Sequence, residues 1–223
     1  MPRVRVHQHV NPLSPYYRQT PKPINIESVF GNPDLPLHLD IGCARGRFLL
    51  KMAEIEPGWN FLGVEIREPL VTEANRIAAE ENLRNLHYAF ANAMLWLETL
   101  IGQIPGGMLQ TVTIQFPDPW FKRKHSKRRM VNKELVDAVV EKLADSGRIF
   151  VQTDIEFLAD EMFELFRDNV ALKEIEVCEN PFRVKTEREM AVEDKQLPVY
   201  RAIFLRRFRH SERAVNTPVL FGL

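Results

Sequence analysis

Residues 37–48, LHLDIGCARGRF, decide the fold that we expect for this chain. The apolar run LHLDI at 37–41 predicts a buried strand. A turn with two glycines, residues 42–46, then leads into residues 47–55, whose apolar side chains recur at helical spacing. A strand, a glycine turn and a helix in immediate succession are typical of an open α/β sheet, in which ligands bind beyond the carboxyl ends of the strands.

The same alternation continues along the chain. Further strands are expected at 60–65, 86–91, 111–116, 148–153, 172–177 and 200–207, and helices at about 69–81, 94–101, 132–144 and 155–167. Strands that alternate with helices predict a mostly parallel sheet with helices on both faces. Only a long polar loop is expected between the last two strands, so at least one of them should run antiparallel.

The composition is that of a globular protein. The chain has 223 residues, of which 45% are hydrophobic and 27% charged, enough for one large domain. The first ten residues lack the apolar core of a signal peptide and no long apolar run occurs, so we expect a cytoplasmic protein without a membrane segment. Neither the two cysteines, Cys43 and Cys178, nor the six histidines show metal-ligand spacing, so we expect no metal.

The two ends of the chain differ from its middle. Five prolines within the first 23 residues argue against regular structure there, and residues 1–26 carry four Lys or Arg and no acid. We therefore expect a flexible basic arm at 1–26, a single domain at 27–209 and a tail at 210–223.

Basic and acidic residues, thirty of each, cancel in sum but not in distribution. Residues 122–129, KRKHSKRR, hold six Lys or Arg and one His, whereas residues 154–179 hold nine acids and two bases. A basic block beside an acidic half produces an oriented field that guides a polyanion to one face. Charge alone leaves a solvated loop open as the alternative.

Three polar side chains end the first three strands. Asp40 precedes the turn that holds Gly42 and Gly46, a G-x-x-x-G spacing that departs from the G-x-G-x-x-G of dinucleotide sites. A carboxylate there repels pyrophosphate but suits the sulfonium and amino groups of S-adenosylmethionine. Glu65 could accept the two ribose hydroxyls of a nucleoside. Asn92 could face an adenine ring, or it could be a plain helix N-cap.

The segment FPDPWF, residues 116–121, ends the fourth strand. Its two prolines restrict the backbone around Asp118, while Trp120 and Phe121 offer flat faces for stacking. This composition is that of a base pocket beside a block of cations, with an ordinary aromatic turn as the alternative. Asp154 ends the fifth strand at the same sheet edge and could instead cap the following helix.

Taken in order, LDIGCARGRF, FLGVEI, ANA, QFPDPWFKRKHSKRRMV, QTD and TERE followed by PVYRAIF resemble the bacterial tRNA (guanine-N7)-methyltransferases over about residues 37–206. The resemblance implies a Rossmann-like class I methyltransferase fold with seven strands, one of them antiparallel. It also implies transfer of a methyl group from S-adenosylmethionine to N7 of a guanosine at position 46, in the variable loop of tRNA, by a monomer or homodimer.

The resemblance also implies site residues. Cofactor contacts fall on Asp40, Glu65, Asn92 and Asp118, with the glycine turn of Gly42 and Gly46, and Asp118 also matches the catalytic position. Substrate contacts fall on Lys122, Asp154, Thr186, Glu187, Arg188 and Glu189, with Arg128 and Arg129 as expected phosphate contacts. This chain departs from the family pattern in having Asp40 where Glu is frequent, Ala44 where glycine is frequent and Asn92 where Asp is frequent.

Two other functions remain open from the residues. Pro-Asp-Pro-Trp could be a variant of the motif of exocyclic-amine methyltransferases, or the basic segments could serve a non-catalytic RNA-binding module. The missing G-x-G-x-x-G argues against a dehydrogenase. Because guanine N7 carries a lone pair and no proton, its methylation needs no general base, nucleophile or metal.

Overall fold

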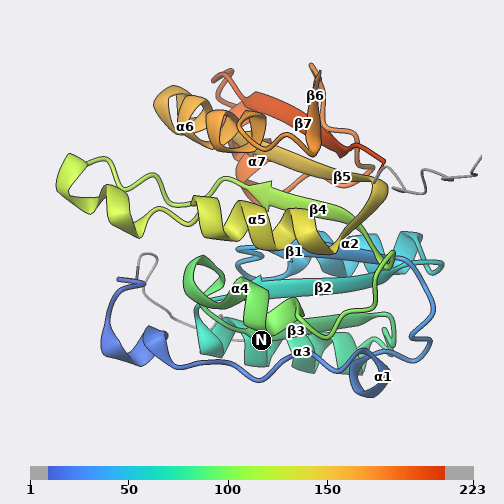
Figure 1. The fold of residues 1–223 in the computed structure, drawn as a ribbon. Coiled ribbons are helices and arrows are strands. Elements are labelled where there is room, and N and C mark those ends of the chain that lie inside the picture. Colours follow the sequence, from blue (N-terminus) through green and yellow to red (C-terminus); the bar gives the residue numbers. More distant parts are fainter. Residues whose placement is uncertain (1–9, 209–223) are drawn as a thin grey trace, which may run out of the picture.

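The computed structural model describes residues 10–208. Its centre is a seven-stranded sheet in the order β3-β2-β1-β4-β5-β7-β6 (Figure 1). Strand β7 runs antiparallel to both neighbours and the other pairs are parallel, which confirms the predicted sheet. The strands are β1 (Leu37–Ile41), β2 (Asn60–Glu65), β3 (Leu86–Phe90), β4 (Leu109–Gln115), β5 (Leu143–Thr153), β6 (Leu172–Glu176) and β7 (Tyr200–Arg206).

Helices cover both faces of the sheet, as predicted. Apolar residues of α4, α5 and α6 pack on one face and those of α2 and α3 on the other. In Figure 1, α5 crosses in front of the sheet and α2 lies behind it. The helices are α1 (Ile26–Val29), α2 (Arg47–Ile55), α3 (Glu68–Glu80), α4 (Ala93–Ile101), α5 (Lys133–Lys142), α6 (Glu156–Arg167) and α7 (Glu187–Glu193), with 3-10 turns η1 (Pro15–Arg18) and η2 (Arg123–Arg128).

The alternation of β1 decides which side chains reach the site. Leu37, Leu39 and Ile41 belong to the core on the side of α4, α5 and α6. Successive residues of a strand point to opposite faces, so His38 and Asp40 point to the other side. His38 lies there against the rings of Phe48 and Phe182. One strand therefore contributes three core residues and two buried polar residues.

The helix expected at 132–144 ends earlier in the structure. Asn132 caps it as predicted, because its side chain accepts a hydrogen bond from the Leu135 amide at 2.8 Å. The helix stops at Lys142 and β5 begins at once. Ser146 and Gly147, expected as a helix stop, lie instead in an irregularity of β5, where Ser146 has a φ of 60°. Ser146 and Gly147 are turn-forming residues, but here they form a bulge within a strand instead of a loop after a helix.

Residues 185–189, expected as a surface loop, hold the start of a helix. Thr186 is the N-cap of α7, and its hydroxyl accepts a hydrogen bond from the Glu189 amide at 3.1 Å. The pattern Thr-x-x-Glu is a helix-start signature, so the sequence did contain the signal. The expectation of a loop missed it because few apolar residues follow.

The N-terminal segment lies against the domain over its described part. Ile24 and Ile26 are buried, and the Ile24 amide donates to the Leu100 carbonyl at 2.8 Å. Regular structure was not expected here, yet η1 forms, with Pro15 at its first position where a missing N–H is tolerated. The division into arm, domain and tail stays a prediction, and residues 1–9 and 209–223, which include the whole predicted tail, lie outside the described residues.

No helix within residues 10–208 is both long and apolar enough to span a membrane. In the same range, no group of three or more His, Cys, Asp or Glu side chains is arranged to hold a metal ion.

Candidate active site

A cavity of about 670 Å³ lies at the carboxyl ends of the parallel strands. Most of the site residues predicted from the sequence line it, although they come from loops that are far apart in the chain. They are Asp40, Gly42, Glu65, Asn92, Asp118, Arg128, Asp154, Thr186, Glu187 and Arg188. Gly46, Lys122, Arg129 and Glu189 are not among the lining residues.

The glycine turn is shaped by a tyrosine beneath it. Gly42 and Gly46 have φ values of 82° and 72°, which glycine adopts without strain. A Cβ on Gly46 would lie 2.5 Å from the Tyr88 ring, whose hydroxyl donates to the Gly46 carbonyl at 2.6 Å. The absence of a side chain at Gly46 therefore lets the turn pack against Tyr88, whereas the exposed Gly42 borders the cavity. Ala44 adopts a φ of 51°, so this chain keeps a left-handed turn without a glycine there.

Asp40 is a buried carboxylate held by a chain of hydrogen bonds. Its Oδ1 accepts from the Thr113 hydroxyl at 2.6 Å, and Thr113 Oγ1 lies 3.1 Å from His38 Nε2. Thr113 has one proton, which it gives to Asp40, so His38 donates from Nε2 to Thr113. Burial lowers the pKa of His38 to about 3 and raises the pKa of Asp40 to about 6. A carboxylate in this setting is stabilised by a cationic ligand.

Glu65 is also buried and fully engaged by the protein. Its Oε1 accepts from the backbone amide and Nε of Arg67, at 2.9 and 2.8 Å. Its Oε2 accepts from the Ala44 amide and from Arg67 Nη2, both at 2.9 Å. These bonds use about four acceptor positions, which is the capacity of a carboxylate. Glu65 can accept ribose hydroxyls, as predicted, only when the Arg67 guanidinium moves aside.

Asn92 binds the N-terminal segment instead of capping its helix. It occupies the N-cap position of α4, but its side chain makes no capping hydrogen bond. Its Nδ2 donates to the carbonyl oxygens of Pro12 and Tyr17, at 2.9 and 3.2 Å. Val10 and Pro12 themselves line the cavity. The predicted adenine contact and the predicted arm therefore meet at one wall of the cavity.

The loop around Asp118 has an unusual backbone. Phe116 and Trp120, which flank the two prolines, have positive φ values of 51° and 44°. Bulky residues rarely adopt this conformation, and such strain concentrates at functional sites. Asp118 is partly exposed at the cavity. Burial acts to lower the pKa of Arg67, but its hydrogen bonds to Glu65, the charge of Glu65 and, to a smaller extent, the charge of Asp118 raise this pKa above its ordinary value.

Aromatic side chains border the same opening. The Arg128 guanidinium lies 5.0 Å above the Trp120 ring, and Phe121 is 68% exposed. Phe121 also meets Phe157 of α6 edge to face, with ring centroids 5.9 Å apart. Exposed aromatic faces beside guanidinium groups are suited to stacking with a nucleobase.

Asp154 pairs with Arg188 instead of capping α6. The N-cap of α6 is Ile155, whose amide donates to the Thr153 hydroxyl at 3.3 Å. An ion pair joins Asp154 to Arg188 at the start of α7, so two predicted substrate residues bind one another across the cavity rim. Glu187 is paired in the same way with Arg47 of α2.

Comparison with known proteins gives the family. A family model described as "Putative methyltransferase" matches residues 34–202. The tRNA (guanine-N(7)-)-methyltransferase of Trichormus variabilis is 52% identical over 210 residues, which cover 92% of this chain and 98% of the relative. That of Synechococcus elongatus is 53% identical over 211 residues, with 92% and 98% covered. The chain belongs to the tRNA (guanine-N(7)-)-methyltransferase family.

Solved structures agree with this methyltransferase family in fold. The antibiotic-resistance methyltransferase Kmr is 14% identical with a TM-score of 0.55, and covers 83% of this chain and 91% of its own. The aminoglycoside resistance methyltransferase NpmB1 is 18% identical with a TM-score of 0.51, and covers 81% and 90%. The class I methyltransferase fold predicted from the sequence is thereby confirmed.

Glu189 was expected to contact the substrate, but the structure places it away from the cavity of the methyltransferase site. It is fully buried, and its carboxylate binds Arg201 at 2.9 Å, Gln152 at 3.1 Å and Asn180 at 2.7 Å. Gln152 donates in turn to Gln115 at 2.8 Å, beside the cavity. Glu189 thus anchors α7 to the sheet rather than facing a macromolecule, because its partners enclose it on all sides.

The sequence reasoning missed several residues of the methyltransferase site. His38, Thr113 and Gln115 alternate on β1 and β4 with core residues, and Arg67 follows Glu65 by two positions. A polar residue inside an apolar strand run was the available signal, since buried polar groups require partners. Which partners these are depends on the pairing of β1 with β4, which places Asp40 beside Thr113.

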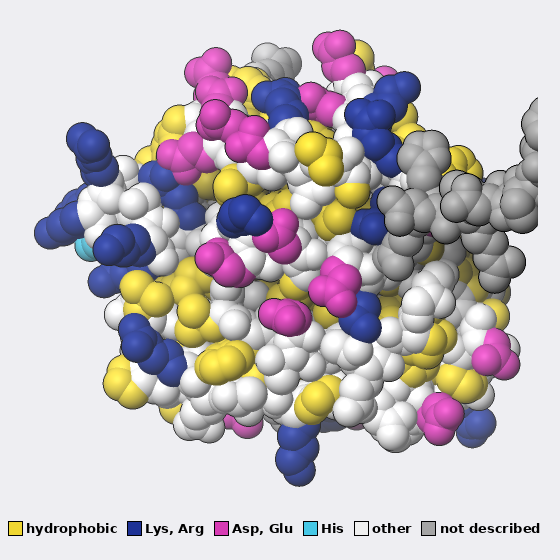
Figure 2. All heavy atoms as spheres, in the orientation of Figure 1, with side chains coloured by type: hydrophobic (Ala, Val, Ile, Leu, Met, Phe, Trp, Pro, Cys, Tyr) yellow, Lys and Arg dark blue, Asp and Glu magenta, His cyan; other side chains and the backbone are white. Residues whose placement is uncertain are grey.

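The basic segment projects from the methyltransferase body. In Figure 2, Lys and Arg side chains gather on the protrusion at the left that Figure 1 shows as the 3-10 turn η2, and acidic side chains gather above it over α6. Four cations of the basic segment are exposed and therefore accessible to a phosphate: Lys122, Arg123, Lys124 and Lys127. Arg128, which lies over Trp120, and Arg129 are only partly exposed, and the Arg129 side chain has an exposed fraction of 13%.

Proposed function

We propose that this chain transfers a methyl group from S-adenosylmethionine to N7 of a guanosine in tRNA, at position 46 of the variable loop, in the cytoplasm. The observation that carries the proposal is that Asp40, near the end of β1, and Asp118, just after the neighbouring strand β4, line one cavity. The names of the relatives, tRNA (guanine-N(7)-)-methyltransferase, support guanine as the base and N7 as the atom that is methylated.

The cavity fits the cofactor in size and chemistry. Pockets for such ligands have volumes of about 300–1,000 Å³, and this one measures about 670 Å³. Asp40 would hold a cationic group of the ligand, and Gly42, without a side chain, lets the ligand approach the turn. Glu65 would hold the ribose of the ligand once the Arg67 guanidinium moves aside, and Asn92, whose Nδ2 binds the N-terminal segment, would face the adenine with its Oδ1. When bound, S-adenosylmethionine supplies an electrophilic methyl group on a sulfonium ion.

The residues of the chain act mainly by positioning. Asp118 would accept hydrogen bonds from guanine N1–H and the N2 amino group, which orients N7 toward the methyl group. Its negative charge also stabilises the positive charge that the purine ring gains on methylation. Asp154, at the same cavity, would add to this field. Because N7 has no proton to lose, no side chain has to remove one.

The substrate side combines charge and stacking. Exposed Lys122 and its neighbours would bind phosphates, which gives affinity, while Trp120 and Phe121 would stack on bases. The acidic side chains above η2 favour approach of the polyanion from the basic side (Figure 2).

The decisive experiment is incubation of the full chain with unmodified tRNA and labelled S-adenosylmethionine, followed by strand cleavage selective for N7-methylguanine. We expect cleavage at one guanosine in the variable loop. A label on an exocyclic amine, identified by nuclease digestion and mass spectrometry, would favour the amine methyltransferase. Tight tRNA binding without cofactor binding would instead identify a non-catalytic RNA-binding module.

Neutralising the exposed part of the basic segment should weaken tRNA binding in a salt-dependent way. For Lys124→Gln with Lys127→Gln we expect a higher KM for tRNA and a slope of log binding constant against log salt that is shallower by about two, since each lost phosphate contact removes roughly one unit. The variant Lys173→Gln, on the exposed strand β6 away from η2, is the control. An unchanged slope in the double variant would contradict these contacts.

Affinity for S-adenosylmethionine should fall below about pH 6. Burial raises the pKa of Asp40 to about 6, hydrogen bonds from Thr113 and Gln115 oppose this, and the charge of Glu65 raises it further. A cationic ligand binds the ionised form, so the dissociation constant should be flat above about pH 7 and should rise about tenfold per unit below 6.

Thr113 offers a matched test of this dependence by calorimetric titration. Thr113→Val removes a hydrogen bond that favours ionised Asp40, so the pH midpoint should move upward, while Thr113→Ser should keep the wild-type profile. Identical profiles for valine, serine and wild type would show that the Thr113 hydrogen bond does not set the pH midpoint, and a profile without any change near pH 6 would show that Asp40 does not control binding.

A further inference from the structure

Arg129 differs from every other cation of the basic segment in its surroundings. Its Nε donates to the Pro119 carbonyl at 3.0 Å and its Nη2 to the Trp120 carbonyl at 3.4 Å. Its Nη1 forms an ion pair with Glu161 of α6. Its guanidinium also lies 5.0 Å above the Phe157 ring, again on α6. One side chain thus joins the loop that carries Asp118 to a helix on the face of the sheet.

The loop needs such a restraint. Phe116 and Trp120 adopt positive φ values on either side of the Pro-Asp-Pro sequence, a conformation that relaxes unless neighbouring groups hold it. Pro117 and Pro119 lack amide donors, so beyond the Phe116 amide, which donates to the Gln152 carbonyl at 2.8 Å, the carbonyl oxygens of the loop serve as backbone anchors. Arg129 binds two of these carbonyls, directly after Asp118 in the chain, and therefore acts on the residues that determine where Asp118 points.

We propose that Arg129, paired with Glu161, is a positioning residue that clamps the strained loop so that Asp118 faces the cavity, and that it is not a phosphate contact. The proposal rests on the catalytic role given to Asp118 under the proposed function. The planar guanidinium fork can bind two carbonyls and a carboxylate at once, which the single ammonium group of lysine cannot do in the same geometry.

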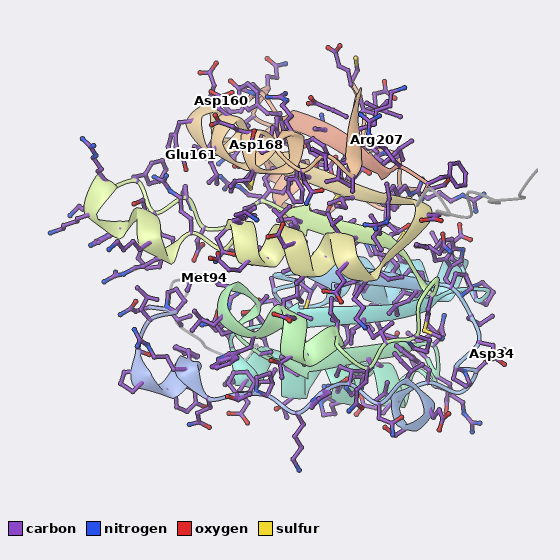
Figure 3. The ribbon with its side chains drawn as sticks, viewed as in Figure 1. Asp34, Met94, Asp160, Glu161, Asp168 and Arg207 are labelled. Carbon is purple, nitrogen blue, oxygen red and sulfur yellow. The ribbon has the colours of Figure 1, made fainter. Side chains whose placement is uncertain are left out.

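The position of Glu161 supports the clamp over a phosphate site. Figure 3 labels Glu161 on α6, on the side toward the loop that precedes α5. A carboxylate bound directly to a guanidinium repels a phosphate from the same group. With its side chain 13% exposed, Arg129 also lacks the open face that a phosphate of tRNA would need, whereas Lys124 and Lys127 have it.

The test compares steady-state kinetics of five variants on unmodified tRNA, with melting temperatures measured alongside. For Arg129→Gln we expect kcat to fall on the order of 10- to 100-fold, since small displacements of a reacting group are costly, with KM for tRNA and its salt slope unchanged. Arg129→Lys should be intermediate. Glu161→Gln should lower kcat several-fold without weakening tRNA binding. Arg167→Gln and Glu174→Gln, which break an exposed ion pair elsewhere, are the matched controls.

A second readout separates the clamp from the chemistry. Hydrogen exchange of peptides covering residues 116–122 should become faster in Arg129→Gln and Glu161→Gln and stay as in wild type in the two controls. Raised KM and a shallower salt slope with normal kcat in Arg129→Gln would overturn the proposal, as would unchanged exchange. The two proposals can fail separately. If wild type forms no N7-methylguanine, the proposed function is wrong, but the exchange measurement still decides whether Arg129 holds the loop.

Discussion

Replacing Asp118 with alanine is expected to abolish most methyl transfer while leaving the fold intact. The side chain lies partly exposed on a loop at the cavity and contributes nothing to the two cores. Loss of one preorganised group at a developing charge reduces kcat by about 10²–10³-fold, and Asp118 would both orient the purine and stabilise its charge. We therefore expect a reduction of at least that size, with the melting temperature close to that of wild type.

Two further variants sharpen the test of Asp118. Asp118→Asn keeps the shape and one acceptor but removes the charge, so its kcat should lie between those of alanine and wild type. Asp160→Asn, an acid on the surface of α6 (Figure 3), is the matched control and should behave as wild type. Single-turnover rates with saturating tRNA are the measurement. Near-normal rates in the alanine variant would remove Asp118 from the mechanism.

Replacing Asp40 with asparagine is expected to weaken cofactor binding and to stabilise the protein. The amide keeps an oxygen that accepts from Thr113, so the hydrogen-bond chain from His38 survives. Loss of a charged partner for a cation costs about 1.5–3 kcal/mol. The dissociation constant for S-adenosylmethionine should therefore rise on the order of 10- to 100-fold, and its dependence on pH near 6 should disappear.

The gain in stability follows from the same pKa. A carboxyl group whose pKa rises from 3.8 to about 6 on folding binds its proton more tightly in the folded state. The free energy of unfolding therefore decreases as pH rises from about 4 to 6, by on the order of 3 kcal/mol. Asparagine avoids this loss, so at pH 8 the variant should melt higher than wild type without ligand.

The control for Asp40 is an exposed acid outside the cavity. Asp34→Asn, in the exposed loop before β1 (Figure 3), should alter neither binding nor melting. Calorimetric titration and thermal unfolding at pH 5 and pH 8 are the measurements. If Asp40→Asn melts lower than wild type at pH 8, the buried charge does not destabilise the folded state.

Much of the sheet was predictable because its signals are local. Apolar runs, the glycine turn and the helical spacing depend on residues within a few positions of each other, and parallel strands bring their carboxyl ends to one edge. The sequence pattern therefore suffices to place Asp40, Glu65, Asn92 and Asp118 at one site. The predictions for the end of α5 and the start of α7 were wrong, because turn residues and a polar helix start each permit two structures.

The residues by themselves determined that acids would gather beside a basic segment at one edge of a seven-stranded sheet, because strands that alternate with helices run mostly parallel and bring their carboxyl ends to one edge. The order of the strands in the sheet appears only in the structure. Tertiary structure alone decided what each polar group binds. His38 reaches Asp40 only through Thr113, Glu189 faces inward to Arg201, and Arg129 turns from solvent to Pro119 and Glu161. The reason is that hydrogen bonds form over about 3 Å, between segments whose separation in space the chain order does not state.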